Sequence, residues 1–126
     1  MLFRSPERQV YRISSAGRTA LDDLRREGLT EIIIKSDPLD LALTRLDPDR
    51  LDELPTVLGE RLATLRRTLA DSETHLESIT HFLTIAELWA MRHQASRWRG
   101  EISWHEDLLK ALPAIIADEK SRKEQK

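Results

Sequence analysis

The sequence contains no cysteine, few aromatic residues and no long apolar run. Without cysteine the chain can form no disulfide, no iron–sulfur cluster, no thiolate zinc site and no thiol nucleophile. Nowhere does it reach the ~18 consecutive apolar residues of a membrane span, and its N-terminus has no apolar core like that of a signal peptide. We therefore expect a soluble, cytoplasmic protein.

The composition suits a small helical protein. Apolar residues make up 40% of the 126 residues and charged residues 33%, a balance typical of amphipathic helices rather than of disorder. The net charge of −2 is unevenly spread: residues 1–18 carry four Arg and one Glu, whereas residues 37–60 carry seven acidic residues and two Arg. The basic end is the candidate nucleic-acid side, and an ordinary solvated surface is the alternative.

The N-terminal part predicts a strand followed by a helix. The segment "QVYRIS" places Tyr11 and Ile13 on one face and Val10 and Arg12 on the other, the period of a half-buried strand. Ser14 or Ser15 is suited to cap a helix over "GRTALDDLRRE", and Gly28 is suited to end it. Three consecutive isoleucines in "LTEIIIKSDP" then favour an extended segment from Glu31 to Lys35.

Two long helices are predicted after this point. Asp-Pro pairs at 37–38 and 47–48 each indicate a helix start, and leucines recur every three or four residues from Leu51 to Leu69. We expect the chain to reverse within "ADSETH", because Thr74 and Glu77 have the spacing of a capping box.

The second long helix carries the most regular apolar seam of the chain. Its positions alternate steps of three and four without interruption through Gly100, which predicts one continuous helix. They are Leu88, Met91, Ala95, Trp98, Ile102, His105, Leu109 and Leu112. Two helices with one seam each shield one another incompletely, so we expect a two-fold symmetric homodimer. The candidate interface residues are Leu88, Met91, Ala95, Trp98, Ile102 and Leu109.

Three motifs, in this order, resemble the PadR family of winged-helix transcription regulators. "RQVYRISSAGRTAL" resembles the wing strand and following helix, "DLALTRLDPDRLDELPTVLGERLATLR" the short and long helices of the second half, and "EISWHEDLLKAL" the last helix. The resemblance implies a mainly α fold with a short N-terminal β-strand and a dimerising bundle of two long C-terminal helices. It divides the chain into a partial winged helix (1–28), a linker strand and short helix (29–48), a helical dimerisation domain (49–118) and a charged tail (119–126).

The resemblance also implies how the chain meets DNA. Three helices precede the wing in this family, and only "MLFRSPER" precedes the strand here, so we expect the recognition helix to be absent. Arg4, Arg8 and Arg12 are then the candidate DNA contacts, through phosphates or a minor groove. Two functions stay open: the dimerisation and effector-response half of a regulator, or an interaction protein that pairs with a full-length regulator and titrates it.

The sequence predicts no enzyme, cofactor or metal site. "WHEDLL" begins like a zinc-protease motif, but Leu109 stands where the second histidine is needed. The resemblance does imply an aromatic residue that stacks planar effectors, for which Trp104 and Trp89, both beside the seam of this helix, are the candidates. The alternative for both is simple packing at an interface.

Overall fold

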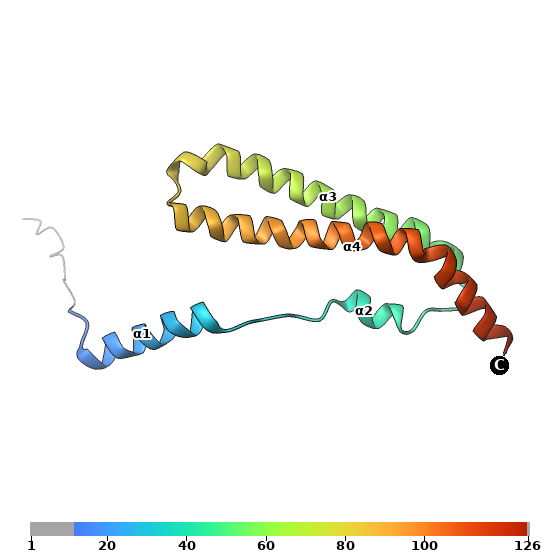
Figure 1. Cartoon of the computed structure of the whole chain (residues 1–126), viewed down its shortest axis with the longest axis horizontal. Coiled ribbons are helices and arrows are strands. Elements are labelled where there is room, and N and C mark those ends of the chain that lie inside the picture. The colour runs from blue at the N-terminus through green and yellow to red at the C-terminus, as the bar shows by residue number, and fades with distance from the viewer. Residues whose placement is uncertain (1–11, 126) are drawn as a thin grey trace, which may run out of the picture. The chain divides into compact units, whose positions relative to one another are not determined.

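Helices and the loops that join them make up all of the part of the chain that the structure describes, residues 12–125 of a computed structural model. In order these are α1 (Ser15–Thr30), α2 (Pro38–Leu43), the 3₁₀ helix η1 (Leu51–Glu53), α3 (Leu54–Ile79), the 3₁₀ helix η2 (Thr80–Phe82) and α4 (Ile85–Glu124) (Figure 1). The chain divides into two compact units, residues 1–40 and 41–126. The mainly α prediction is confirmed.

The predicted β-strand is wrong for the part of "QVYRIS" that can be assessed. No strand occurs between residues 12 and 125, and residues 12–14 are an irregular lead into α1. The isoleucine segment is irregular as well, and Ile34 is 87% exposed. A strand requires a neighbouring strand to receive its backbone hydrogen bonds, and neither segment has one among the described residues. Residues 9–11 of the predicted strand lie outside the described part.

Helix α1 begins where the sequence predicts and ends later. The Ser14 hydroxyl accepts a hydrogen bond from the backbone N–H of Gly17 at 3.0 Å, which confirms the cap. The helix continues past Gly28 to Thr30, whose hydroxyl donates to the carbonyl of Arg26 at 2.8 Å. The predicted stop at Gly28 is therefore wrong. No residue of α1 is buried in its own unit.

Helix α3 runs straight through the predicted reversal. It continues to Ile79 because Leu76 and Ile79 extend its apolar stripe and stay half-buried. The chain reverses over residues 80–84 instead. There the Thr84 hydroxyl accepts from the N–H of Glu87, and the Glu87 carboxylate accepts from the N–H of Thr84, both at 3.1 Å. A capping box is therefore present, but its threonine is Thr84, ten residues after the predicted Thr74.

Helix α4 is one continuous helix of 40 residues, about 60 Å long. It passes through Gly100 without a break, which confirms the prediction from the seam. Its C-terminal part departs from the direction of the rest (Figure 1), and Pro113 lies inside it. Because proline cannot donate a backbone hydrogen bond to the preceding turn, a bend is expected there.

The core of the second unit lies between α3 and α4, which run side by side as an antiparallel hairpin (Figure 1). Its buried apolar residues come from η1, α3 and α4: Leu51, Leu58, Leu62, Ala95, Leu108 and Leu112. Every position of the predicted α4 seam is buried or half-buried. The C-terminal end of α4 is held to the acidic segment before α3, where Lys120 and Lys123 pair with Asp52 and Asp49.

Candidate functional site

A buried polar contact joins the two long helices near the middle of α4. His105 is only 1% exposed. Its Nε2 accepts a hydrogen bond from Nε of Arg61 at 2.9 Å, and its Nδ1 lies 2.6 Å from the carbonyl oxygen of Glu101. Because a guanidinium only donates, Nε2 must be the unprotonated nitrogen and Nδ1–H donates to Glu101. The seam position that looked least apolar is therefore fully satisfied as a neutral histidine.

Two ion pairs cross the hairpin outside the core. Arg99 on α4 meets Glu73 on α3 at 2.6 Å, and Arg66 on α3 meets Glu106 on α4 at 3.5 Å. All four side chains are about half exposed, so each pair contributes little to stability. Both pairs require the α3–α4 register seen here, and they hold the side chains of the hairpin surface in place.

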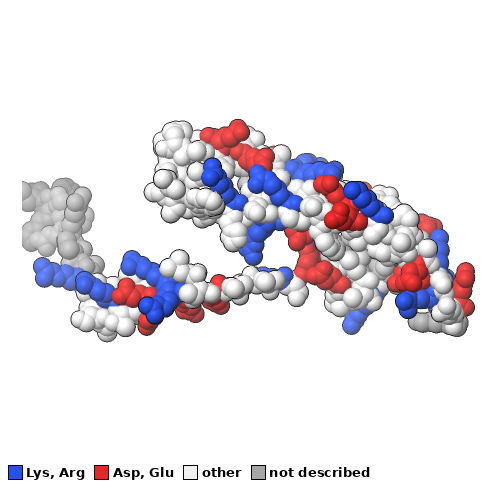
Figure 2. Space-filling model, in the orientation of Figure 1, with Lys and Arg blue, Asp and Glu red and all other residues white. Residues whose placement is uncertain are grey.

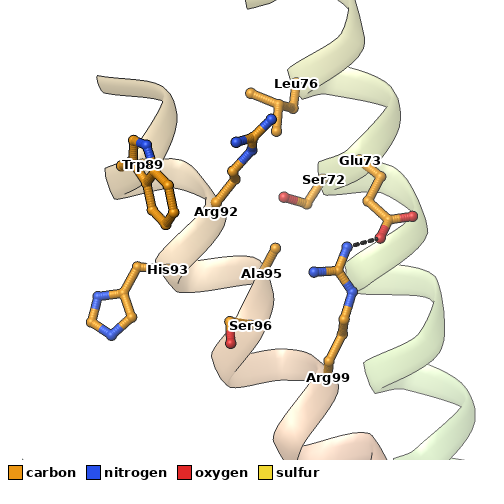
Figure 3. Close-up of a pocket in the computed structure, with 9 residues that line it drawn as sticks. All are labelled: Ser72, Glu73, Leu76, Trp89, Arg92, His93, Ala95, Ser96 and Arg99. Carbon is orange, nitrogen blue, oxygen red and sulfur yellow. Dashed lines mark hydrogen bonds and ion pairs between the residues drawn. The ribbon is translucent and has the colours of Figure 1, made fainter. Parts of the chain in front are cut away.

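A groove of about 550 Å³ opens between α3 and α4 near the reversal, and Figure 3 shows it in close-up. The floor is apolar and comes from Leu76 and Ala95, while the walls are polar, cationic and aromatic. The lining residues are Ser72, Glu73, Leu76, Trp89, Arg92, His93, Ala95, Ser96 and Arg99. The volume lies within the range of small-molecule sites, although the groove is open to solvent along one side.

Trp89 gives the groove an exposed aromatic face. Its side chain is 66% exposed, and the guanidinium of Arg92 lies 5.9 Å from the ring centroid, a cation–π distance. On the other side, Glu73 neutralises and orients Arg99 (Figure 3). A planar molecule that stacks on Trp89 would therefore meet an apolar floor and one guanidinium, that of Arg92, which forms no ion pair with another described residue.

Trp104 lies away from this groove. Its ring and the His105 ring lie nearly perpendicular, with the centroids 5.2 Å apart and the planes at 80°, and Trp104 remains 41% exposed. The two candidate stacking residues therefore do not share a site within one chain. Their role toward a ligand stays a prediction.

The candidate interface residues occupy the face of α4 that takes part in the hairpin. Ala95 is 5% exposed, and Leu88, Met91, Trp98, Ile102 and Leu109 are half-buried. Much of the seam is thus covered by α3 of the same chain. Any additional contact of these residues with a second copy stays a prediction.

The candidate DNA contacts are only partly visible. Arg4 and Arg8 lie outside the described residues, and Arg12 is exposed just before α1. On the face shown in Figure 2, basic and acidic side chains alternate along the hairpin. A continuous basic surface for nucleic acid is not formed on that face.

The described residues form neither a metal site nor a membrane span, and the chain has no match among known proteins. Within residues 12–125, no three histidine, aspartate or glutamate side chains gather as a metal site would require. The same range contains no helix long and apolar enough to span a membrane. No family model, no curated protein and no solved structure matches this chain.

Sequence reasoning missed most of the groove. Glu73 and Arg99 are 26 residues apart, and only the true position of the reversal brings them opposite one another. A reversal within "ADSETH" would have placed Ser72 and Glu73 in a turn. The signal that was overlooked is Thr84 with Glu87, the same capping-box spacing as Thr74 with Glu77, directly before the long seam.

Proposed function

We propose that this chain is the helical dimerisation and effector-response half of a PadR-like transcription regulator and acts in the cytoplasm as a homodimer. The order of the three sequence motifs supports the resemblance, and a hairpin of two long antiparallel helices suits a dimerising half. The alternative is an interaction protein that captures a full-length regulator through the same helices.

The observation that carries dimerisation is the set of large apolar side chains that stay exposed in each unit. They include Leu24 and Ile33 in the first unit and Phe82 and Ile85 in the second. Exposed apolar side chains of this kind are typical of surfaces that pack against a partner.

Sedimentation equilibrium tests the dimer directly. At micromolar concentration we expect twice the chain mass. A clean monomer at that concentration would remove the basis of the proposal, since neither alternative works without pairing helices.

DNA binding separates the regulator from the titrating partner. Phosphate contacts alone give affinity without sequence preference, so we expect dissociation constants on the order of 10⁻⁴ to 10⁻⁶ M with a steep salt dependence. Replacing Arg4, Arg8 and Arg12 together by Ala should remove this binding. The matched control is a triple Ala variant of three exposed arginines on α3 and α4: Arg66, Arg67 and Arg122.

The outcomes are distinct. Loss of binding in the first variant and retention in the control supports a regulator that touches DNA. No measurable binding by the unaltered chain supports the titrating partner. Selection of one site over bulk DNA by a thousandfold or more would contradict the expectation that phosphate contacts alone supply the affinity.

The effector part of the proposal rests on the groove beside Trp89. We expect a planar aromatic probe, 1-anilinonaphthalene-8-sulfonate, to bind there and to quench indole fluorescence. Trp89→Ala should weaken this binding about tenfold, and Phe82→Ala, at an exposed aromatic residue that does not line the groove, serves as the matched control. Equal loss in both variants, or none in either, would argue against an effector site in the groove.

A further inference from the structure

Helix α4 carries a second line of residues on its solvent side, here called the outer stripe. It consists of His93, Arg97, Gly100, Trp104, Asp107 and Ala111, and all six are exposed. Their spacing is four, three, four, three and four residues, which keeps them on one face of a helix over almost three heptads. The apolar seam towards α3 lies on a different face, so α4 has one covered and one uncovered packing surface.

The outer stripe is self-complementary in spacing. Because the intervals read the same in both directions, an antiparallel copy of α4 centred on residue 102 places every stripe residue opposite another stripe residue. Gly100 then faces Trp104 of the second copy, Arg97 faces Asp107, and His93 faces Ala111. A two-fold axis produces each of these contacts twice.

The size of the side chains favours this register. A Cβ atom added to Gly100 would meet nothing within 4 Å, so the helix surface is open at this position and carries no side chain there. Trp104 leaves 41% of its large ring exposed four residues away. An indole that fits over a glycine lets two helices approach closely and removes apolar surface from water.

The charges of the outer stripe also favour the register centred on residue 102. Asp107 makes no side-chain hydrogen bond or ion pair with any other residue in the described range. Arg97 takes part in an interaction within its own chain, but a guanidinium has five N–H donors and can also meet a carboxylate of a second copy. A register centred on Gly100 itself would place Arg97 opposite Ser103 and Trp104 opposite Ser96, which loses both complementarities.

We infer that the outer stripe of α4 is the homodimer contact, with two antiparallel copies centred on residue 102. The inference rests on the proposed function, because it assumes that the chain dimerises, and it adds which surface does so and in which register. The partner is a second copy of this chain, and the contact is formed by Trp104 over Gly100 and by Arg97 with Asp107.

A charge-reversal pair tests the register. In Arg97→Glu both cross-chain pairs become acid against acid, and in Asp107→Arg both become base against base. We expect each variant alone to dimerise at least about tenfold more weakly than the unaltered chain. An equimolar mixture of the two restores both pairs in the heterodimer, which should form within about threefold of the original dissociation constant. Both sites are exposed, so folding should be unaffected, and circular dichroism checks this.

Gly100→Leu provides a second line of evidence. Leucine favours a helix over glycine and its Cβ meets nothing within 4 Å in its own chain, but its side chain occupies the space over residue 100 that Trp104 of the second copy would take. We expect a more helical protein that dimerises at least about tenfold more weakly.

If the unaltered chain is a monomer, the proposed function fails and this inference fails with it. If it is a dimer that the reversals and Gly100→Leu leave unchanged, only the inferred contact is wrong.

Discussion

The Nε–H group of Arg61 donates to Nε2 of His105 across 2.9 Å, and this contact ties the middle of α4 to the first half of α3. Both hydrogen-bonding positions of the buried imidazole are filled, since Nδ1 donates to the carbonyl of Glu101. His105 therefore belongs to the core as a polar member whose hydrogen bonds depend on one helix register.

Replacing this histidine should destabilise the hairpin. We expect His105→Ala to lower the free energy of unfolding by about 2–4 kcal/mol, because a cavity forms and the Arg61 donor loses its acceptor. Urea denaturation of dilute protein measures the change. His75→Ala is the matched control, since His75 is exposed on α3, and it should shift stability by less than about 0.5 kcal/mol. Equal effects of the two variants would contradict the buried contact.

The position of the reversal can be tested through its cap. Thr84→Ala removes the hydroxyl that accepts from Glu87 and should cost about 1 kcal/mol of stability. Thr74→Ala is the informative comparison, because Thr74 is exposed within α3 and alanine is the better helix former there. We expect the second change to be neutral or slightly stabilising. A larger loss at Thr74 than at Thr84 would move the reversal back to residues 70–75.

Gly100 tests the continuity of α4. On protein dilute enough to be monomeric, Gly100→Ala should raise stability by up to about 1 kcal/mol, since the added methyl group meets no atom of the chain. Gly100→Pro should cost about 3 kcal/mol or more. Thermal unfolding followed by circular dichroism measures both. Strong destabilisation by alanine would mean that residue 100 occupies a turn.

The ion pair between Lys123 and Asp49 at the end of α4 should be visible in a pH titration. A hydrogen bond from Lys123 and its positive charge lower the pKa of the exposed Asp49 carboxyl. A carboxyl with a lowered folded pKa stabilises the fold above its unfolded pKa, and this contribution is lost as the pH falls through the folded value. We expect the NMR titration midpoint of Asp49 below the ordinary aspartate range, and a return to that range in Lys123→Ala. An unchanged titration midpoint of Asp49 in the variant would show that this ion pair is absent in solution.

The sequence was most informative where side-chain periodicity and packing agree. The seam from Leu88 to Leu112 predicted a continuous α4 through Gly100, because eight positions in register outweigh the helix cost of one glycine. The Ser14 cap followed from local hydrogen bonding in the same way. Both features depend on residues that are close in sequence, so one amino-acid sequence is enough to predict them.

The errors arose where a local signal needed a distant partner. "QVYRIS" and the isoleucine run have the composition of strands, but pairing decides whether a strand forms. Among residues 12–125 no neighbouring strand is present for residues 12–14 or 31–35. Thr74 and Thr84 offer the same capping chemistry, and the apolar stripe that continues through the half-buried Leu76 and Ile79 selects the second. The groove at Trp89 forms only when the chain reverses at residues 80–84, so the sequence analysis, which placed the reversal at residues 70–75, did not predict it.

The short connection at residues 80–84 also bears on how quickly the protein acquires its structure. Because α3 and α4 are consecutive in the chain and joined by one tight reversal, their packing closes only a small loop and the contact order of the hairpin is low. Helical hairpins of this kind fold on a timescale of about microseconds to milliseconds. The second unit should thus be assembled before two chains meet, and stopped-flow refolding should show a fast phase whose rate does not depend on protein concentration.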